Sequence, residues 1–373
     1  MARTVIGVND AKAVKKYSGL LAVDVPNKSF FGSRMMGEGE NAEMPIQRLT
    51  ELESEAGDQI TFDLSMQLTD EPVEGDNILE GTEEDLTFYT DSLYIDQQRK
   101  GVNAGGKMTR KRTIHKLRDV ARKRQAEYWA RLFDEVIFIY LSGARGVNSG
   151  FVFPTTWTGR ANNSLSAPDS QHLLMPKLSG GTVATKATLT SAETMSLALI
   201  DRFVAMAGTM GGDGSGVPAI QPMNQQGELR YVCVMHDWQE YDLRNGTSTG
   251  QWLDIQKAAS AALGKESPIF KGGLGMHNNV VLQKHKNVIR FSDYGSGLNL
   301  PAARALFLGV QAAVIAFGSP GAGLRFDWHE EMIDRGNQLV VDTSCIWGVK
   351  KTTFNGLDYG VVACDTYAAN PNP

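Results

Sequence analysis

Ser248 is the first residue whose surroundings suggest chemistry, because it stands within Gly-Thr-Ser-Thr-Gly at residues 246–250. This fits the G-x-S-x-G pattern, in which a hydrolase exposes a nucleophilic serine on a sharp turn between a strand and a helix. The preceding segment, HDWQEYDLRN (236–245), has helical rather than strand spacing. A hydrolase using Ser248 is therefore the weakest of the three functions that the sequence suggests.

His329 and Glu330 begin the segment WHEEMIDRG like a zinc-protease helix, but the second histidine of H-E-x-x-H is absent. The remaining histidines have no metal-ligand spacing. The glycine-rich loop GGDGSG (211–216) lacks the Gly-Lys-Ser/Thr that completes a phosphate loop. We therefore expect no enzymatic activity, no metal ion and no cofactor.

The class of protein follows from composition, which is 42% hydrophobic and 21% charged, as in ordinary globular proteins. Cys233, Cys345 and Cys364 lack C-x-x-C spacing, which indicates buried thiols in a reducing compartment. Residues 1–25 lack the apolar core of a signal peptide. No apolar run reaches the roughly 20 residues that span a bilayer. The chain is expected to be made and to remain in a cytoplasm, without a membrane partner.

Charge is divided into two adjacent blocks of opposite sign. Residues 32–96 hold 18 Asp/Glu against two Lys/Arg, and residues 97–131 hold 12 Lys/Arg against two acids. The acids that we expect at an inter-subunit surface are Glu71, Glu74, Asp76, Glu80, Glu83, Glu84 and Asp85. The basic residues that we expect to face a neighbouring subunit or DNA are Arg110, Lys111, Arg112, Lys116, Arg118, Arg122, Lys123 and Arg124.

Three interpretations of these blocks remain open. Both could be solvated faces, although this explains poorly why the signs segregate. The basic block could bind a nucleic-acid backbone, but the chain has a net charge of −5 and the acidic block would repel DNA. The third interpretation is self-complementarity, in which the acidic block of one copy lies on the basic block of the next. Exposed ion pairs contribute only about 0.2–1 kcal/mol each, so their effect would be on register and steering.

The acidic block is expected to form a long hairpin over residues 59–96. ITFDLSMQL (60–68) alternates apolar and polar residues, and LTFYTDSLYID (86–96) is the returning strand, with Leu86 and Phe88 in alternation. A two-stranded ribbon is marginal alone, so it needs another surface of this chain or of a neighbour. Residues 1–58 show no sustained period and are interpreted as an extended arm with the same need.

The basic block begins a long helix, predicted over residues 109–142, capped by Thr109 or Thr113 and ended by Gly143. If continuous it would be about 50 Å long. Its apolar stripe comprises Ile114, Leu117, Ala121, Tyr128, Leu132, Val136 and Ile139.

The remaining chain mixes predicted helices and strands, which indicates α+β organisation. Helices are expected over 188–208 with Ser191 as N-cap, and over 236–245 and 251–263. LRYVCVM (229–235), NNVVLQKH and NVIRFSD (278–293) are expected to be strands. PAARALFLGVQAAVIAFG (301–318) is interpreted as an apolar helix, or a helix followed by a strand. Strands are expected from residue 324 onward.

This order of parts resembles the major capsid proteins of tailed bacteriophages with the Hong Kong 97-type fold, and within them a family of short-tailed-phage coat proteins. The stretches that carry the resemblance span most of the chain. They are GEGENA (37–42), GDQITFDL (57–64), VEGDNILEGTEEDLTFYTDSLYIDQQR (73–99), WARLFDEVIFIYLSG (129–143), HDWQEYDLR (236–244), WLDIQKAA (252–259), PIFKGGLGMHNNVVLQKH (268–285), ARALFLGVQAAVIAFG (303–318) and FNGLDYGV (354–361).

The resemblance implies a division of the chain into five segments. Residues 1–58 would be an N-terminal arm that wraps neighbouring subunits, and 59–106 an extended loop over an adjacent subunit. Residues 107–187 would be a peripheral domain with its spine helix at 109–142, and 188–323 an axial domain. Residues 324–373 would supply peripheral-domain strands and the C-terminal tail.

The implied function is a major capsid protein that self-assembles, as hexamers and pentamers, into an icosahedral head enclosing double-stranded DNA. It would be located in the virion after assembly in the host bacterial cytoplasm. Whether portal, scaffold and decoration proteins are further partners stays open, and no covalent cross-link is predicted. The alternative is a cytoplasmic oligomeric nucleic-acid-binding protein.

Overall fold

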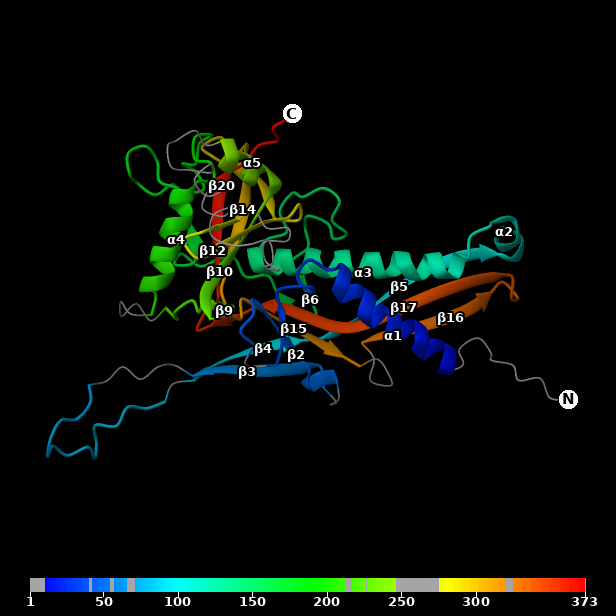
Figure 1. Cartoon of the computed structure of the whole chain (residues 1–373), viewed down its shortest axis with the longest axis horizontal. Coiled ribbons are helices and arrows are strands. Elements are labelled where there is room, and N and C mark those ends of the chain that lie inside the picture. The colour runs from blue at the N-terminus through cyan, green and yellow to red at the C-terminus, as the bar shows by residue number, and fades with distance from the viewer. Residues whose placement is uncertain are drawn as a thin grey trace.

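Helix α3 (Leu117–Ser142) runs along the long axis of the molecule and joins two β-sheets (Figure 1). At one end of α3 lies a lobe that carries α4 (Leu197–Thr209) and α5 (Asp237–Asn245). Toward its other end, long strands run beside α3, and α1 (Ala11–Lys28) lies across them. The computed structural model describes residues 11–39, 42–53, 57–65, 71–86, 88–211, 217–225, 227–245, 275–319 and 325–372.

The first sheet lies beside α3 and α1. Among the described residues it has the order β1-β2-β15-β17-β16, and β5 also pairs with β17. Strands β1 and β2 join in parallel, whereas β15, β16 and β5 are antiparallel to β17. The strands are β1 (Met36–Glu38), β2 (Ile46–Leu49), β5 (Asp96–Gly106), β15 (Ala313–Gly318), β16 (Phe326–Ile333) and β17 (Gln338–Lys351).

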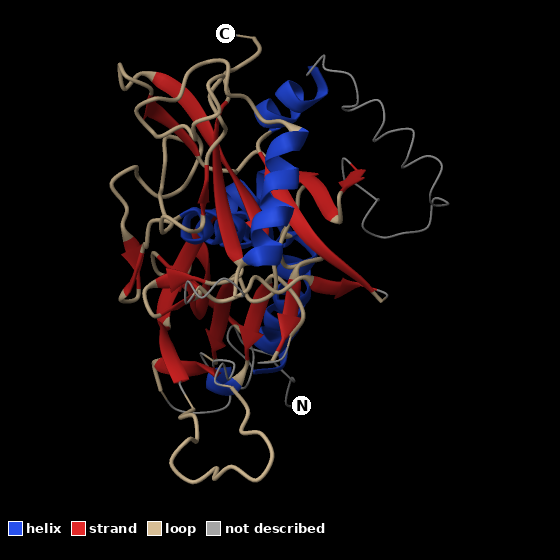
Figure 2. Ribbon diagram, turned by 90° about the vertical axis from the view of Figure 1, so that its left-hand side faces the viewer, coloured by secondary structure: helices blue, strands red, loops and turns tan. Residues whose placement is uncertain are grey.

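The second sheet forms the lobe with α4 and α5 (Figure 2). Its order within the described residues is β11-β12-β10-β14-β20-β8, with β13 attached to β14 and β9 to β10. Its strands are β8 (Leu173–Leu174), β9 (Met223–Gln225), β10 (Glu228–Met235), β11 (Gly275–His277), β12 (Val280–Lys284), β13 (Arg290–Tyr294), β14 (Leu300–Leu308) and β20 (Val361–Tyr367). Short pairs stand outside both sheets: β3 (Gln59–Ser65) with β4 (Phe88–Tyr94), β6 (Gly159–Arg160) with β7 (Asn163–Ser164), and β18 (Thr353–Phe354) with β19 (Leu357–Asp358).

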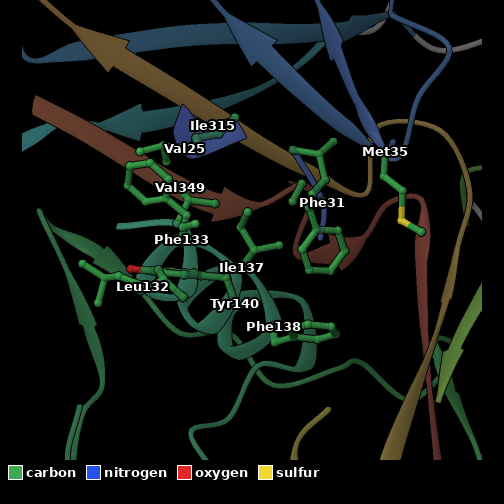
Figure 3. Packing of buried hydrophobic residues seen from close by; sticks show 14 of the residues in the cluster. Val25, Phe31, Met35, Leu132, Phe133, Ile137, Phe138, Tyr140, Ile315 and Val349 are labelled. Atoms are coloured by element: carbon green, nitrogen blue, oxygen red, sulfur yellow. The ribbon is translucent and has the colours of Figure 1, made fainter. Parts of the chain in front are cut away.

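The main core forms where α3 meets the first sheet and the segment after α1. Val25 and Phe31 point toward Phe133, Ile137 and Phe138 of α3 (Figure 3). All five side chains are buried, and so is every residue of α3 from Leu132 to Ser142, as the apolar sequence predicts. Burial of this apolar area is the main stabilising term of the fold.

A buried carboxylate fixes the N-terminal segment to α3. Asp134 accepts hydrogen bonds from the Ser29 hydroxyl at 2.7 Å and from the Phe30 N–H at 2.9 Å. The Phe31 N–H donates to the same carboxylate at 3.3 Å. Burial raises the pKa of Asp134, and these donors oppose that rise. Residues 11–28 form helix α1, so the expectation of an extended conformation is wrong for them. Leu21 and Val25 of this helix pack in the same core as α3.

The predicted spine helix is broken near its beginning. Residues 107–112 form the separate helix α2, and α3 starts only at Leu117. Helix α2 buries no residue, and Thr113 takes an extended conformation, so no packing holds the first turns in line with α3. Lys116, not Thr109 or Thr113, is the N-cap of α3. The predicted end is confirmed, because Gly143 adopts a left-handed conformation (φ 68°).

Several further predictions can be compared with the structure. The segment 301–318 forms strands β14 and β15, so the predicted helix is wrong, whereas the strand expected after it in the second interpretation is confirmed by β15. Helix α4 begins after Ser196 rather than Ser191. Helix α5 and strands β10, β12 and β13 are confirmed, whereas the helix expected over 251–263 lies outside the described residues.

The chain also crosses between the sheets more often than the expected five segments imply. Strand β15, from the segment expected to be axial, pairs with β2 and β17 in the first sheet. Strand β20, from the last segment, pairs with β14 in the second sheet. The two sheets are therefore tied together by the chain itself as well as by α3.

Candidate functional site

The loop between β3 and β4 projects away from the body of the molecule (Figure 1). Its described residues, 71–86, are called the acidic finger because they hold all seven acids predicted at an inter-subunit surface. Two turns shape it: the Asn77 N–H donates to the Glu74 carbonyl, and the Thr82 N–H donates to the Leu79 carbonyl at 3.1 Å. Six of the seven acids are exposed, and Glu84 is half-buried.

Glu83 is held in its charged form by the backbone of the finger. Its carboxylate accepts a hydrogen bond from the Gly81 N–H at 2.6 Å. Hydrogen bonds from its own N–H and from that of Gly81 lower the pKa of Glu83. The finger therefore presents a fixed negative charge at neutral pH.

The root of the finger is anchored, which confirms the predicted ribbon of β3 and β4. Buried Asp91 of β4 contacts Lys350 Nζ of β17 and accepts hydrogen bonds from the Thr353 N–H and hydroxyl at 3.3 Å each. Phe62 of β3 meets Phe354 edge to face, with ring centroids 6.0 Å apart. The ribbon thus lies on its own chain at its root, and only the finger extends beyond it.

The second candidate surface is the basic end, defined as residues 107–124, which covers α2 and the first turns of α3. Arg118 Nε lies 2.5 Å from Glu330 Oε1, and Trp328 Nε1 donates to the same oxygen at 2.7 Å. Arg122 lies 3.6 Å from Asp24 of α1. These two arginines therefore partly serve to hold β16 and α1 against α3.

Other basic residues of this end remain accessible. Arg124 pairs with Glu127 one turn later at 2.7 Å, and Arg110 donates to the Asn337 carbonyl at 3.3 Å. Among the described residues 107–124, the basic side chains that are exposed and form no ion pair are Lys107, Lys111, Arg112, Lys116 and Lys123. Such exposed ammonium and guanidinium groups are available to an acidic neighbour or to phosphates.

The finger and the basic end lie at opposite ends of the molecule (Figure 1). The ionic contacts described for the basic end come from α1, α3 and β16, not from the finger. The predicted acids and bases are therefore not brought together within one chain, and they could meet only between copies.

Exposed apolar side chains were not anticipated at either surface. Ile78 and Leu79, in the middle of the finger, are 77% and 60% exposed. Ile114, expected on the buried stripe of the long helix, is 98% exposed, because it falls in the break between α2 and α3. The only sequence signal for these positions is an aliphatic residue inside a run of charges.

The candidate enzyme motifs do not form a catalytic or metal site in the described structure. His329 and Glu330 lie on strand β16, not on a helix, and Glu330 is bound by Arg118 and Trp328. No grouping of three His, Cys, Asp or Glu side chains suited to a metal ion occurs within the described ranges. Ser248 lies outside them. Of the helices described, none combines the length and apolar character needed to cross a membrane.

Comparison with known proteins relates the whole chain to one family. The family model described as "Phage capsid protein" matches residues 5–370. The chain is 26% identical over 361 residues to the "Major capsid protein" of Pseudomonas phage KPP25, covering 87% of this chain and 88% of that protein.

Two solved structures extend the comparison to the fold. "Capsid of Ralstonia phage GP4" is 51% identical, with a TM-score of 0.84 and complete coverage of both chains (100% each). "Cyanophage Pam1 capsid asymmetric unit" is 23% identical, with a TM-score of 0.69, covering 89% of this chain and 91% of that one. The second likeness concerns the fold alone.

Proposed function

This chain belongs to the phage capsid protein family, and on that premise we propose that it is a major capsid (coat) protein that self-assembles into an icosahedral head enclosing double-stranded DNA. The observation that carries the proposal is the 51% identity, over the whole chain, to the capsid protein of Ralstonia phage GP4. Its role is structural rather than enzymatic, and its location is the virion.

The physical basis of assembly is the separation of the acidic finger from the basic end. Each copy carries a negative projection at one end and a positive surface at the other (Figure 1). The finger of one copy lies over the basic end of the next, within hexamers and pentamers. Because exposed ion pairs are individually weak, many repeated contacts are required to stabilise the shell.

The parts of the chain take the positions of a Hong Kong 97-type subunit. The ribbon of β3 and β4 with its finger is the extended loop, and α3 is the spine of a peripheral domain that contains the first sheet. The second sheet, with α4 and α5, is the axial domain around the five-fold and six-fold axes. Residues 1–58 are the N-terminal arm; α1, β1 and β2 pack within their own chain, so contact with neighbouring subunits is assigned to the rest of the arm.

Packaged DNA is the second partner. The exposed basic residues Lys111, Arg112, Lys116 and Lys123 also offer groups that bind phosphates. Assembly takes place in the host bacterial cytoplasm.

Electron microscopy and light scattering of the purified, expressed protein test the proposal. Closed particles of virion size are expected as the protein concentration is raised. A discrete small oligomer at every concentration and salt condition would contradict the proposal, and salt-dependent DNA binding by such an oligomer would favour a nucleic-acid-binding protein instead.

A further inference from the structure

Large apolar side chains are exposed at the acidic finger beyond what its turns require. Ile78 follows the first turn of the finger and Leu79 begins the second, and Leu86 and Phe88 follow near its root, all of them exposed. No described part of the same chain covers them, because the finger extends beyond the body (Figure 1). Single exposed aliphatic residues are ordinary, but a group on one projecting loop indicates a contact surface.

A second group of exposed apolar side chains lies at the basic end. Met108 of α2, Ile114 in the break and Val120 of α3 are 60%, 98% and 41% exposed. The break itself places Ile114 outside the helical stripe that would have buried it. This group stands among Lys111, Lys116 and the other positive charges of the basic end.

Both groups therefore consist of exposed apolar side chains, and the charges around the two groups have opposite signs. Acids surround the apolar pair on the finger, and basic residues surround the apolar group at the break. Since the two groups lie at opposite ends of the folded molecule, neither can cover the other within one subunit (Figure 1). A second copy of this chain supplies both the apolar surface and the complementary charge.

We propose that Ile78 and Leu79 of one copy pack against Ile114, with Met108 and Val120 beside it, in a second copy. This inference rests on the proposed function and refines it, because it assigns the contact energy to the apolar side chains. Burying large aliphatic side chains stabilises a contact more than exposed ion pairs do, so the charges mainly set the register.

Disulfide cross-linking tests the contact directly. The three native cysteines are buried, so cysteines introduced at the surface can be oxidised selectively. We expect the double variant Leu79→Cys/Ile114→Cys, assembled into particles and then oxidised, to give a ladder of covalent oligomers on a denaturing gel. The matched controls are each single variant and Leu79→Cys/Leu229→Cys, since Leu229 is 59% exposed but lies on β10 in the other sheet.

The outcomes separate this inference from the proposed function. Particles that show no ladder, or show the same ladder with Leu229→Cys, overturn the contact and leave the capsid function intact. Failure of the unchanged protein to form particles contradicts the capsid function itself.

A pair of substitutions at one position decides the matter if the double cysteine variant does not assemble. Ile114→Ser removes the aliphatic group from a fully exposed site, so the subunit fold is preserved. It should raise the subunit concentration needed for assembly about tenfold or more, whereas Ile114→Leu should assemble like the unchanged protein. Equal assembly of the serine and leucine variants overturns the inference.

Discussion

Arg304 and Asp365 form a buried, two-pronged ion pair in which Nε donates to Oδ1 and Nη2 donates to Oδ2, each at 2.6 Å. Arg304 Nη1 also donates to the Ser142 carbonyl at 2.7 Å, at the C-terminal end of α3. The pair lies on neighbouring strands β14 and β20. It thereby fastens the second sheet to the helix that carries the first sheet.

Asp365→Asn should destabilise the subunit by about 3–5 kcal/mol, because it leaves a buried guanidinium without its counter-charge. Urea denaturation of unassembled subunits measures the change. The control is Asp293→Asn, which removes an exposed ion pair with Lys186 (2.6 Å) and should cost no more than about 1 kcal/mol. Equal decreases in the free energy of unfolding of the two variants would show that the buried ion pair stabilises the subunit no more than the exposed one.

Gly143→Ala should be costly, because Gly143 has φ 68° and an added Cβ would meet the backbone of Ser166 and Ala167. The left-handed conformation alone costs a non-glycine residue about 1–2 kcal/mol. The matched variant is Gly150→Ala, where φ is 87° and no atom lies within 4 Å of the added Cβ. We expect a distinctly larger loss in the free energy of unfolding for Gly143→Ala. If both lose the same amount, the steric contribution is absent.

Acid should weaken the fold through His285. Its burial, with Lys286 nearby, lowers its pKa from 6.5 to about 4. Between these values the unfolded chain binds more protons than the folded chain. The contribution of His285 to the free energy of unfolding is therefore fully present above pH 6.5. It is lost as the pH drops toward 4, which lowers the free energy of unfolding by about 3 kcal/mol. Melting temperatures measured from pH 7 to pH 4 follow this loss.

The variant His285→Phe isolates this contribution. Its ring can keep the stacking that His285 makes on Phe138, at a centroid distance of 4.9 Å, but it cannot titrate. The slope of stability against pH should be shallower in the variant. His236, whose pKa burial and Arg290 lower to about 4, continues to titrate in both proteins. Identical slopes would remove His285 as a cause of acid sensitivity.

Reversal of charge on the finger should block assembly without unfolding the subunit. In the triple variant Glu83→Lys, Glu84→Lys and Asp85→Lys, the finger would repel the basic end of a neighbour. Electron microscopy should show no particles, while circular dichroism stays unchanged, since the finger lies outside the core.

Restoring complementarity provides the control for that experiment. Adding Lys111→Glu, Arg112→Glu and Lys116→Glu to the triple variant exchanges the signs of both surfaces. Particle formation should return at least in part. Normal particles from the triple variant alone would exclude these charges from the contact.

Local patterns in the sequence predicted those elements whose own residues determine them. The alternation of Ile60, Phe62 and Leu64 with polar residues predicted the ribbon of β3 and β4, because the apolar face of β3 packs against the rest of the subunit. Gly143 ended α3 where predicted, since few other residues tolerate its conformation. The opposite charges of the two surfaces were also readable, because they are simple runs along the chain.

The structural features that the sequence did not predict depend on contacts between segments that are distant along the chain. Residues 301–318 are apolar on both faces because β14 and β15 lie inside sheets, and such a run cannot be told from a buried helix by its period. The helix at 11–28 depends on its packing against α3. Asp134 accepts hydrogen bonds from N–H groups that lie more than 100 residues away in the sequence. The break before Leu117 exposes Ile114, which periodicity had placed in the core.

The placement of the finger and the basic end at opposite ends of the molecule also determines how a row of copies can end. When copies join head to tail, each placing its finger on the next, an open row of any length leaves one finger and one basic end without a partner. Only a row whose last copy meets its first satisfies both, so head-to-tail growth ends when the row closes into a ring.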